Sequence, residues 1–261
     1  LYDVSGIGRT SAASIHSRAQ SAGILSVGGA SDLGDNEFIF FGHDNADLSA
    51  WEAVTDIPGN DPNIHRLMRE WRVDVTGDPG TVILSLSQSA LPALPSGFDS
   101  YVVFVDNNGD FTDGATDYGL TLSGDEYIAD NVSLSKGDYI MIAAVNVEVQ
   151  FNASADSARE DVANPGIAVT LNYALNDLFD VGYRVIEGTA TGGGVDYSLN
   201  PGRLEFNPGE KQKDIQPLIM DDTIVEIPDE YFIVELYDPS DNVSPGDTTQ
   251  FRYTILDNDL S

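Results

Sequence analysis

Four groups of acidic residues in the second half of the chain have the composition of a metal site. Each group lies close to the end of a segment rich in β-branched and aromatic residues. In chain order the groups are Glu160 with Asp161, Asp196 alone, Asp221 with Asp222, and Asp257 with Asp259. Carboxylates that converge without a cation repel one another, and their pKa values rise. Calcium accepts about six to eight oxygen ligands in flexible geometry, so these groups predict bound calcium.

Each of these acids also has an ordinary structural interpretation. Asp is common in turns, where its side chain bonds the backbone, and a charged loop residue is readily solvated. For any single acid this interpretation is as good as a metal ligand. Four groups, most of them with two acids, favour calcium when they are taken together.

A second candidate calcium site lies in the first half of the chain, at residues 106–117. The positions that match ligands 1, 3, 5, 7 and 12 of an EF-type loop, with position 7 acting through its backbone carbonyl, are Asp106, Asn108, Asp110, Thr112 and Asp117. Three features differ from that pattern: the last acid is Asp and not Glu, the glycine comes two positions early, and a predicted strand precedes the loop. An Asx-rich hairpin turn explains the same residues, and both interpretations stay open.

Other residue types give little support for catalysis. His16, His43 and His65 have no nucleophile motif and no metal-type spacing beside them. The absence of cysteine excludes disulfides, thiolate metal sites and a cysteine nucleophile. We therefore expect a protein that is not an enzyme.

Arginine and tryptophan residues in the first half allow two interpretations each. Arg66, Arg69 and Arg72 are expected to pair with internal acids, and the alternative is a site for an anionic ligand. Trp51 and Trp71 are expected to pack in the core, and the alternative is stacking on sugar rings.

The elements that must position these residues are predicted to be β-strands. Short β-branched and aromatic runs are separated by Gly, Asn, Asp and Pro, which is typical of antiparallel sandwiches. One stretch, residues 61–71, favours a turn or two of helix. In the first half, strands are predicted at residues 37–42, 70–75, 81–86, 100–105 and 138–143. In the second half, they are predicted at residues 144–152, 167–175, 181–187, 202–206, 212–219, 230–236 and 248–256.

The composition limits the partners that the protein can have. The 261 residues include 12 Lys and Arg against 43 Asp and Glu, which gives a net charge of −31 spread over both halves. Such a surface repels nucleic acid, whose phosphates need clustered cations, and it attracts divalent cations. With 41% hydrophobic residues the chain can still build ordered cores. The length and strand pattern predict two all-β domains in series, residues 1–146 and 147–261.

The ordered motifs of the second half resemble a Calx-beta domain, the immunoglobulin-like module of sodium–calcium exchangers, integrin β4 and many bacterial surface proteins. They are Gly188-Thr-Ala with Asp196-Tyr197, then residues 202–210, 221–232 and 255–259. The resemblance implies a seven-stranded sandwich with calcium ligands at Glu160, Asp196, Asp221, Asp222, Glu226, Glu230, Asp257 and Asp259. Two departures from the family pattern are Asn258, in place of the middle acid of a terminal triplet, and Ile227-Pro228, which lengthens the Glu226–Glu230 spacing.

The first half is similar to a module of large exported Bacteroidota surface proteins that carry type IX secretion signals. The similarity lies in residues 5–14, 38–45, 69–74 and 103–110, and the module implies no function of its own. Together the two resemblances and the missing initiator Met predict a processed or excised region of a longer, secreted or cell-surface bacterial protein. We expect calcium to rigidify it as a structural or adhesive region, with a surface glycan or another protein as a further partner. The alternative is a carbohydrate- or partner-binding accessory region of an exported multidomain enzyme.

Overall fold

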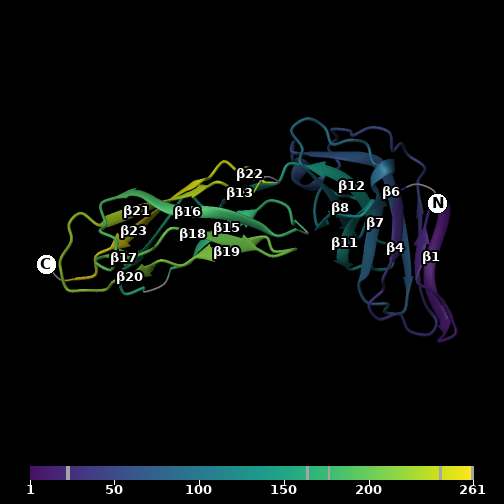
Figure 1. Ribbon diagram of the computed structural model, residues 1–261, viewed down its shortest axis with the longest axis horizontal. Coiled ribbons are helices and arrows are strands. Elements are labelled where there is room, and N and C mark those ends of the chain that lie inside the picture. Colours follow the sequence, from purple (N-terminus) through teal and green to yellow (C-terminus); the bar gives the residue numbers. More distant parts are fainter. Residues whose placement is uncertain (22–23, 163–164, 176, 241–242, 260–261) are drawn as a thin grey trace. The chain divides into compact units, whose positions relative to one another are not determined.

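The computed structural model describes residues 1–21, 24–162, 165–175, 177–240 and 243–259. Within these ranges the regular structure is β-strand, apart from the short 3-10 turns η1 (Pro58–Asn60) and η2 (Gln88–Ala90). The described chain has no helix of the length and hydrophobicity that would span a membrane. It divides into two compact units (Figure 1): unit 1 is Leu1–Asn146 with Tyr173–Asp177, and unit 2 is Val147–Asn172 with Leu178–Ser261. The prediction of an all-β chain with two sandwiches in series is confirmed.

Unit 1 consists of a seven-stranded and a five-stranded sheet. The larger sheet has the order β2 (Ser14–His16), β1 (Tyr2–Ser11), β5 (Glu37–His43), β6 (Ile64–Thr76), β12 (Tyr139–Val145), β8 (Ser100–Asp106) and β9 (Thr116–Gly119). The smaller has the order β10 (Thr121–Ser123), β11 (Glu126–Val132), β7 (Val82–Ser87), β4 (Leu25–Gly28) and β3 (Arg18–Gln20). Buried side chains from both sheets, including Trp71 and Leu84, form one core.

The helix predicted at residues 61–71 is wrong, because most of this stretch belongs to the long strand β6. Strand β6 pairs with β5 on one side and β12 on the other. Trp71 and Val73 are buried, whereas Arg72 between them is exposed, as the alternation of a strand requires. Pairing on both sides and burial of alternate residues outweigh the weak local preference for helix.

Unit 2 also has two main sheets. The four-stranded sheet has the order β19 (Gln212–Ile215), β15 (Ile167–Leu171), β13 (Glu148–Phe151) and β22 (Ser244–Pro245). The five-stranded sheet has the order β14 (Ala155–Arg159), β23 (Gln250–Leu256), β21 (Glu230–Tyr237), β16 (Phe179–Gly188) and β18 (Gly202–Phe206), and β17 (Tyr197–Ser198) pairs separately with β20 (Leu218–Ile219). Aromatic contacts such as Phe151–Phe251 and Phe232–Tyr253 fill the core of unit 2.

The strand register of unit 2 brings the acidic loops to one end. Strands β14 and β23 are parallel, and Arg159 at the end of β14 lies opposite Leu256 at the end of β23. Strand β21 is antiparallel to β23, so that Glu230 at its start lies opposite Ile255. The segments that follow β14 and β23 therefore meet the segment that precedes β21. Figure 1 shows these ends, with β17 and β20, close to the C-terminus.

Candidate metal centre

The first acidic cluster, cluster 1, consists of Glu160, Asp257 and Asp259. One carboxylate oxygen of each residue lies within 4.8 Å of the others. Glu160 directly follows β14 and is buried, with 3% of its surface exposed, and the two Asp residues follow β23. The Glu160 N–H donates to the Leu256 carbonyl at 3.2 Å, which extends the parallel strand pairing up to the cluster.

The second acidic cluster, cluster 2, consists of Asp196, Glu226 and Glu230, again with one oxygen of each within 4.8 Å of the others. Asp196 is buried and precedes β17, and its carboxylate accepts a hydrogen bond from the Thr191 N–H. Glu230 is the first residue of β21. Because Asp196 comes from a different loop than Glu226 and Glu230, the fold is needed to bring the three carboxylates together.

Burial and mutual repulsion raise the pKa values of several carboxyl groups in the two clusters. For Glu160 and Glu226, desolvation by burial is the largest cause, and neighbouring carboxylates add to it. The pKa of Glu230 rises to about 7, first through burial and then through its hydrogen bond with Asp196. Desolvation and the adjacent acids also raise the pKa of Asp259. These groups ionise reluctantly, which is the condition that a bound cation relieves.

Two carboxylate oxygens at the clusters are buried without a hydrogen-bond donor among the described residues. They are Oε2 of Glu230, in cluster 2, and Oδ2 of Asp259, in cluster 1. An unsatisfied buried acceptor is costly, and a cation satisfies it. The donors are all hard oxygens, the kind that calcium prefers. The residues of both clusters therefore fit a calcium ion.

A hydrogen bond joins the two clusters. The Oδ2 atom of Asp257 in cluster 1 accepts from the Glu226 N–H of cluster 2 at 3.0 Å, and its Oδ1 atom accepts from the Asp259 N–H at 2.8 Å. Asp229 accepts from the Asp257 N–H at 3.2 Å. Asp257 of cluster 1 is therefore in direct contact with the backbone of cluster 2.

Six of the eight predicted ligands of unit 2 lie in the two clusters, and two lie outside them. Six of them form the clusters: Glu160, Asp257 and Asp259, and Asp196, Glu226 and Glu230. Asp221 reaches cluster 1 indirectly, because its Oδ1 atom accepts from the Asn258 amide at 2.9 Å. The Oδ1 atom of Asp222 accepts from the Ile224 N–H at 2.6 Å, and Asp222 is exposed. The ligand set itself stays a prediction.

Three residues near the clusters were not among the predicted ligands. The sequence indicates Asn258 only as a departure from the family pattern, and Arg159 and Asp229 are not predicted as ligands. Asn258 donates to Glu160 and Asp221, Arg159 donates to Asn258, and Asp229 accepts from Asp257. The hydrogen-bonding capacity of an amide flanked by two acids was the available signal for Asn258.

The predicted calcium loop at residues 106–117 is held by a series of turns. Asp106 Oδ1 accepts from the N–H groups of Asn108 and Gly109, and Asn108 Oδ1 accepts from the Asp110 N–H. Asp110 Oδ1 accepts from both the N–H and the hydroxyl of Thr112. Asp117 Oδ2 accepts from the Ala174 N–H. These bonds match the Asx-turn interpretation, and a calcium ion in this loop stays a prediction.

The predictions for the tryptophan and arginine residues of unit 1 are confirmed in part. Trp71 is fully buried, and Trp51 packs against the core while its indole donates to the Ala93 carbonyl, so their packing role is confirmed. Arg66 is buried and pairs with Asp56 and Glu70, as expected. By contrast, Arg69 donates to a backbone carbonyl, and Arg72 lies over the Tyr139 ring with no ion pair among the described residues.

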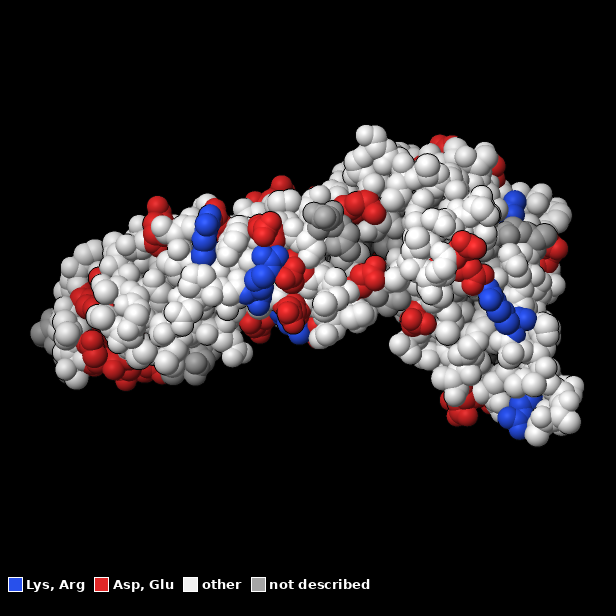
Figure 2. Space-filling view, in the orientation of Figure 1, with Lys and Arg blue, Asp and Glu red and all other residues white. Residues whose placement is uncertain are grey.

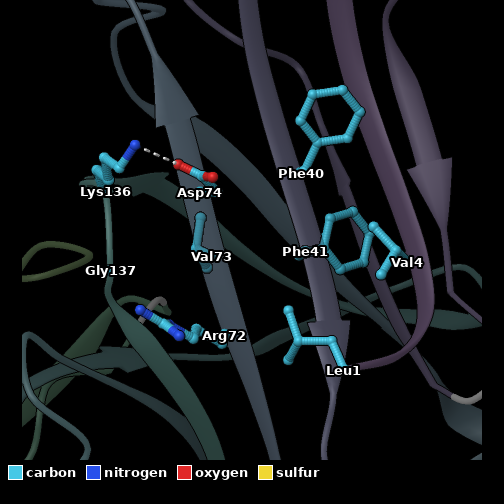
Figure 3. Close-up of a pocket in the computed structure, with 9 residues that line it drawn as sticks. All are labelled: Leu1, Val4, Phe40, Phe41, Arg72, Val73, Asp74, Lys136 and Gly137. Carbon is cyan, nitrogen blue, oxygen red and sulfur yellow. Dashed lines mark ion pairs between the residues drawn. The ribbon is translucent and has the colours of Figure 1, made fainter.

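Arg72 borders a groove of about 310 Å³ on the face of the seven-stranded sheet. Figure 3 shows apolar side chains, Leu1, Val4 and Phe40, along one side of it. On the other side lie Arg72 and the ion pair between Lys136 and Asp74, whose charged atoms are 3.3 Å apart. The groove is therefore apolar on one side, and on the other it has a guanidinium that makes no ion pair among the described residues.

Two protein families match the chain. Residues 143–259 match the Calx-beta domain, which confirms the resemblance of the second half. Residues 2–138 match a domain of unknown function (DUF8202), and the resemblance of this half to exported bacterial modules stays a prediction.

Individual relatives cover only parts of the chain. Sodium/calcium exchanger 2 of Mus musculus is 48% identical over 61 residues, which are 23% of this chain and 6% of the exchanger. The Homo sapiens protein of the same name is 46% identical over 61 residues, again 6% of its length. Two solved structures are similar: the apo form of the Calx CBD1 domain (25% identity, 44% of this chain, 99% of that chain, TM-score 0.41) and the calcium binding domain CBD12 of CALX1.1 (26%, 43%, 45%, 0.40).

Proposed function

Because the chain belongs to the family of the domain of unknown function DUF8202 and carries a Calx-beta domain after it, we propose that unit 2 binds calcium within a non-enzymatic structural or adhesive region. The observation that carries this proposal is the pair of carboxylate clusters at one end of unit 2. The reported relatives are sodium/calcium exchangers, and a similar structure is described as a calcium binding domain. Neither of these proteins is matched over its whole length by this chain.

The residues of the two clusters would hold the ions, and calcium would supply charge neutralisation and a cross-link between loops. Glu160, Asp257 and Asp259 would act in one place, and Asp196, Glu226 and Glu230 in the other. In the ion-free protein, burial and then repulsion between the carboxylates raise the pKa values of Glu160 and Glu226. Figure 2 shows acidic side chains at this end of unit 2.

Binding would stiffen this end of unit 2 and stabilise its fold. A ligand that binds only the folded state contributes about 2.7 kcal/mol when its concentration is one hundred times Kd. The loops after β14, β20 and β23 would then be tied together by ions in addition to their few hydrogen bonds. A region that bears load outside the cell would benefit from this, and extracellular calcium modules bind with Kd values of about 10⁻⁴–10⁻³ M.

Calorimetric titration of the 261-residue chain with calcium tests the proposal. We expect binding heat for the native protein and a loss of affinity of about tenfold or more in Glu160→Gln. The matched control is Glu187→Gln, which removes the same charge from an exposed position of unit 2. If about 10 mM calcium, well above the affinities expected for such modules, gives no heat, the proposal is wrong.

We also propose a secreted or cell-surface location in bacteria. The acidic surface, with its net charge of −31, and the proposed use of millimolar calcium suit an extracellular environment. Antibody labelling of intact bacterial cells that produce the parent protein would test this. Labelling that requires permeabilised cells would contradict a surface location.

The groove beside Arg72 favours a second candidate function, the binding of a glycan or protein partner by unit 1, as in an accessory region of an exported enzyme. Exposed Phe40 offers a ring for stacking, and Arg72 offers a guanidinium to a polar or acidic group. A glycan or peptide ligand should lose affinity in Arg72→Ala while calcium binding is unchanged. Equal affinity of both proteins for every ligand tested would remove this candidate.

A further inference from the structure

The side chain of Asn258 donates two hydrogen bonds that an ionised carboxylate in its place could not donate. Its side-chain amide nitrogen donates to Glu160 Oε1 at 2.9 Å and to Asp221 Oδ1 at 2.9 Å. Its backbone N–H also donates to Glu160 Oε1, at 3.2 Å. One neutral residue thus connects the segment after β14, the segment after β20 and the segment after β23.

Arg159 supports Asn258 from the other side. Its guanidinium donates to the Asn258 side-chain oxygen at 2.9 Å, and the same guanidinium lies 3.8 Å from an oxygen of Asp161. The bond leaves both amide hydrogens of Asn258 directed at the carboxylates, because the oxygen of the amide is already occupied. Arg159 also places one positive charge beside an otherwise acidic region.

These hydrogen bonds stabilise Glu160 in an environment of negative charge. Glu160 is buried, and Asp257, Asp259 and Asp222 each raise its pKa by their charge. The backbone N–H of Asn258 opposes this effect by donating to Glu160, and the side-chain amide donates a second hydrogen bond to the same oxygen. Hydrogen bonds to ionised groups are stronger than neutral ones. An acid at position 258 would remove the side-chain donors and add one more negative charge.

We propose that Asn258, oriented by Arg159, is a positioning residue that holds Glu160 and Asp221 in place without a cation and thereby lowers the number or affinity of the ions that cluster 1 takes. The first part concerns the ion-free protein and is independent of calcium. The second part rests on the proposed calcium binding of unit 2. Cluster 2 has no equivalent amide among the hydrogen bonds of its described carboxylates, so the two clusters would respond differently to calcium.

Two substitutions at position 258 separate these parts. Asn258→Ala removes the side-chain hydrogen bonds without adding charge, and Asn258→Asp removes the donors and adds a carboxylate. In chelator we expect Asn258→Ala to lower the melting temperature by about 4 °C or more, and Asn258→Asp to lower it further. In calcium, Asn258→Asp should bind an additional ion or bind about tenfold more tightly, whereas Asn258→Ala should not.

Two controls distinguish the effect of the Asn258 hydrogen bonds from general effects of charge and folding. Asn200→Asp adds the same charge at an exposed position of unit 2 and should leave both measurements close to those of the native chain. Arg159→Ala combined with Asn258→Ala should lower the melting temperature by less than the sum of the single effects, since the two residues act together.

Native-like melting of both Asn258 variants in chelator would overturn the first part of the inference. Calcium titrations of Asn258→Asp that match those of the native chain would overturn the second part. A native chain that gives no calcium heat would instead remove the proposed function, while the melting experiment in chelator would still decide the role of Asn258.

Discussion

Replacement of Glu230 by Gln should make the ion-free protein less sensitive to pH. The pKa of Glu230 is raised from 4.5 to about 7 in the folded protein, mainly by burial. Between these values the folded state retains a proton that the unfolded state has lost, so stability falls as the pH rises through this window. Below about pH 4.5 both states are protonated, and above about pH 7 the loss is complete.

The size of the effect follows from the shift in pKa. At about 1.4 kcal/mol for each pH unit, the shift from 4.5 to about 7 means that ionised Glu230 costs the folded state about 3.5 kcal/mol at most. Partial exposure of the side chain and screening reduce this, so we expect about 1–2 kcal/mol, or about 4–8 °C in the melting temperature of a domain of this size. Gln stays neutral, and its amide can donate to Asp196 as protonated Glu230 does.

Thermal melts in chelator at pH 5.5 and pH 8.5 provide the assay. The native chain should melt at a lower temperature at pH 8.5 than at pH 5.5. In Glu230→Gln this fall in melting temperature should be smaller by most of the about 4–8 °C attributed to Glu230. Glu187→Gln, which removes an exposed charge from unit 2, should not reduce the fall in this way. At pH 8.5 calcium should stabilise the native chain more than Glu230→Gln. The same pH-dependent loss in the native chain and in Glu230→Gln would refute the reasoning.

Three further outcomes are expected. Chelation should speed proteolysis within residues 221–228, which lie between cluster residues, and equal digestion with and without calcium would contradict the proposed stiffening. Gly8→Val should lower the melting temperature of unit 1, because an added Cβ would lie 2.2 Å from the Phe38 ring. Calcium binding measured by calorimetry should be unchanged. A native melting temperature would contradict this prediction. Arg66→Ala should cost unit 1 about 1–3 kcal/mol in denaturant unfolding, since it removes a large buried side chain and its ion pairs with the partly exposed Asp56 and Glu70, whereas Arg69→Ala should cost less.

The sequence was sufficient to predict the β-architecture because alternation and turn residues are local signals. It failed at residues 61–71, where pairing of β6 with two neighbours decides the structure and no local feature reports it. Trp71 lies in the core as predicted, because a large ring in a strand of alternating burial has few other stable positions.

The candidate site was predictable in its residue types and not in its grouping. Acidic residues beside strand ends identify a metal site, but the division into two clusters depends on the opposition of Glu230 and Ile255 and of Arg159 and Leu256. An amide between two acids at position 258 indicates a hydrogen-bond donor, but its partners could not be predicted for the same reason. The Asn258 amide is a useful donor only because folding brings Glu160 and Asp221 to it.

The parallel pairing of β14 with β23 has a mechanical consequence. Five residue pairs, from Ala155 opposite Arg252 to Arg159 opposite Leu256, join the two strands in register. A pull on the start of β14 and the end of β23 in opposite directions slides one strand along the other, so these contacts share the force and must break together. In an antiparallel hairpin pulled from its open end, the contacts would break one after another. Unit 2 is thus built to resist tension along β14 and β23 by shear, even before an ion is bound.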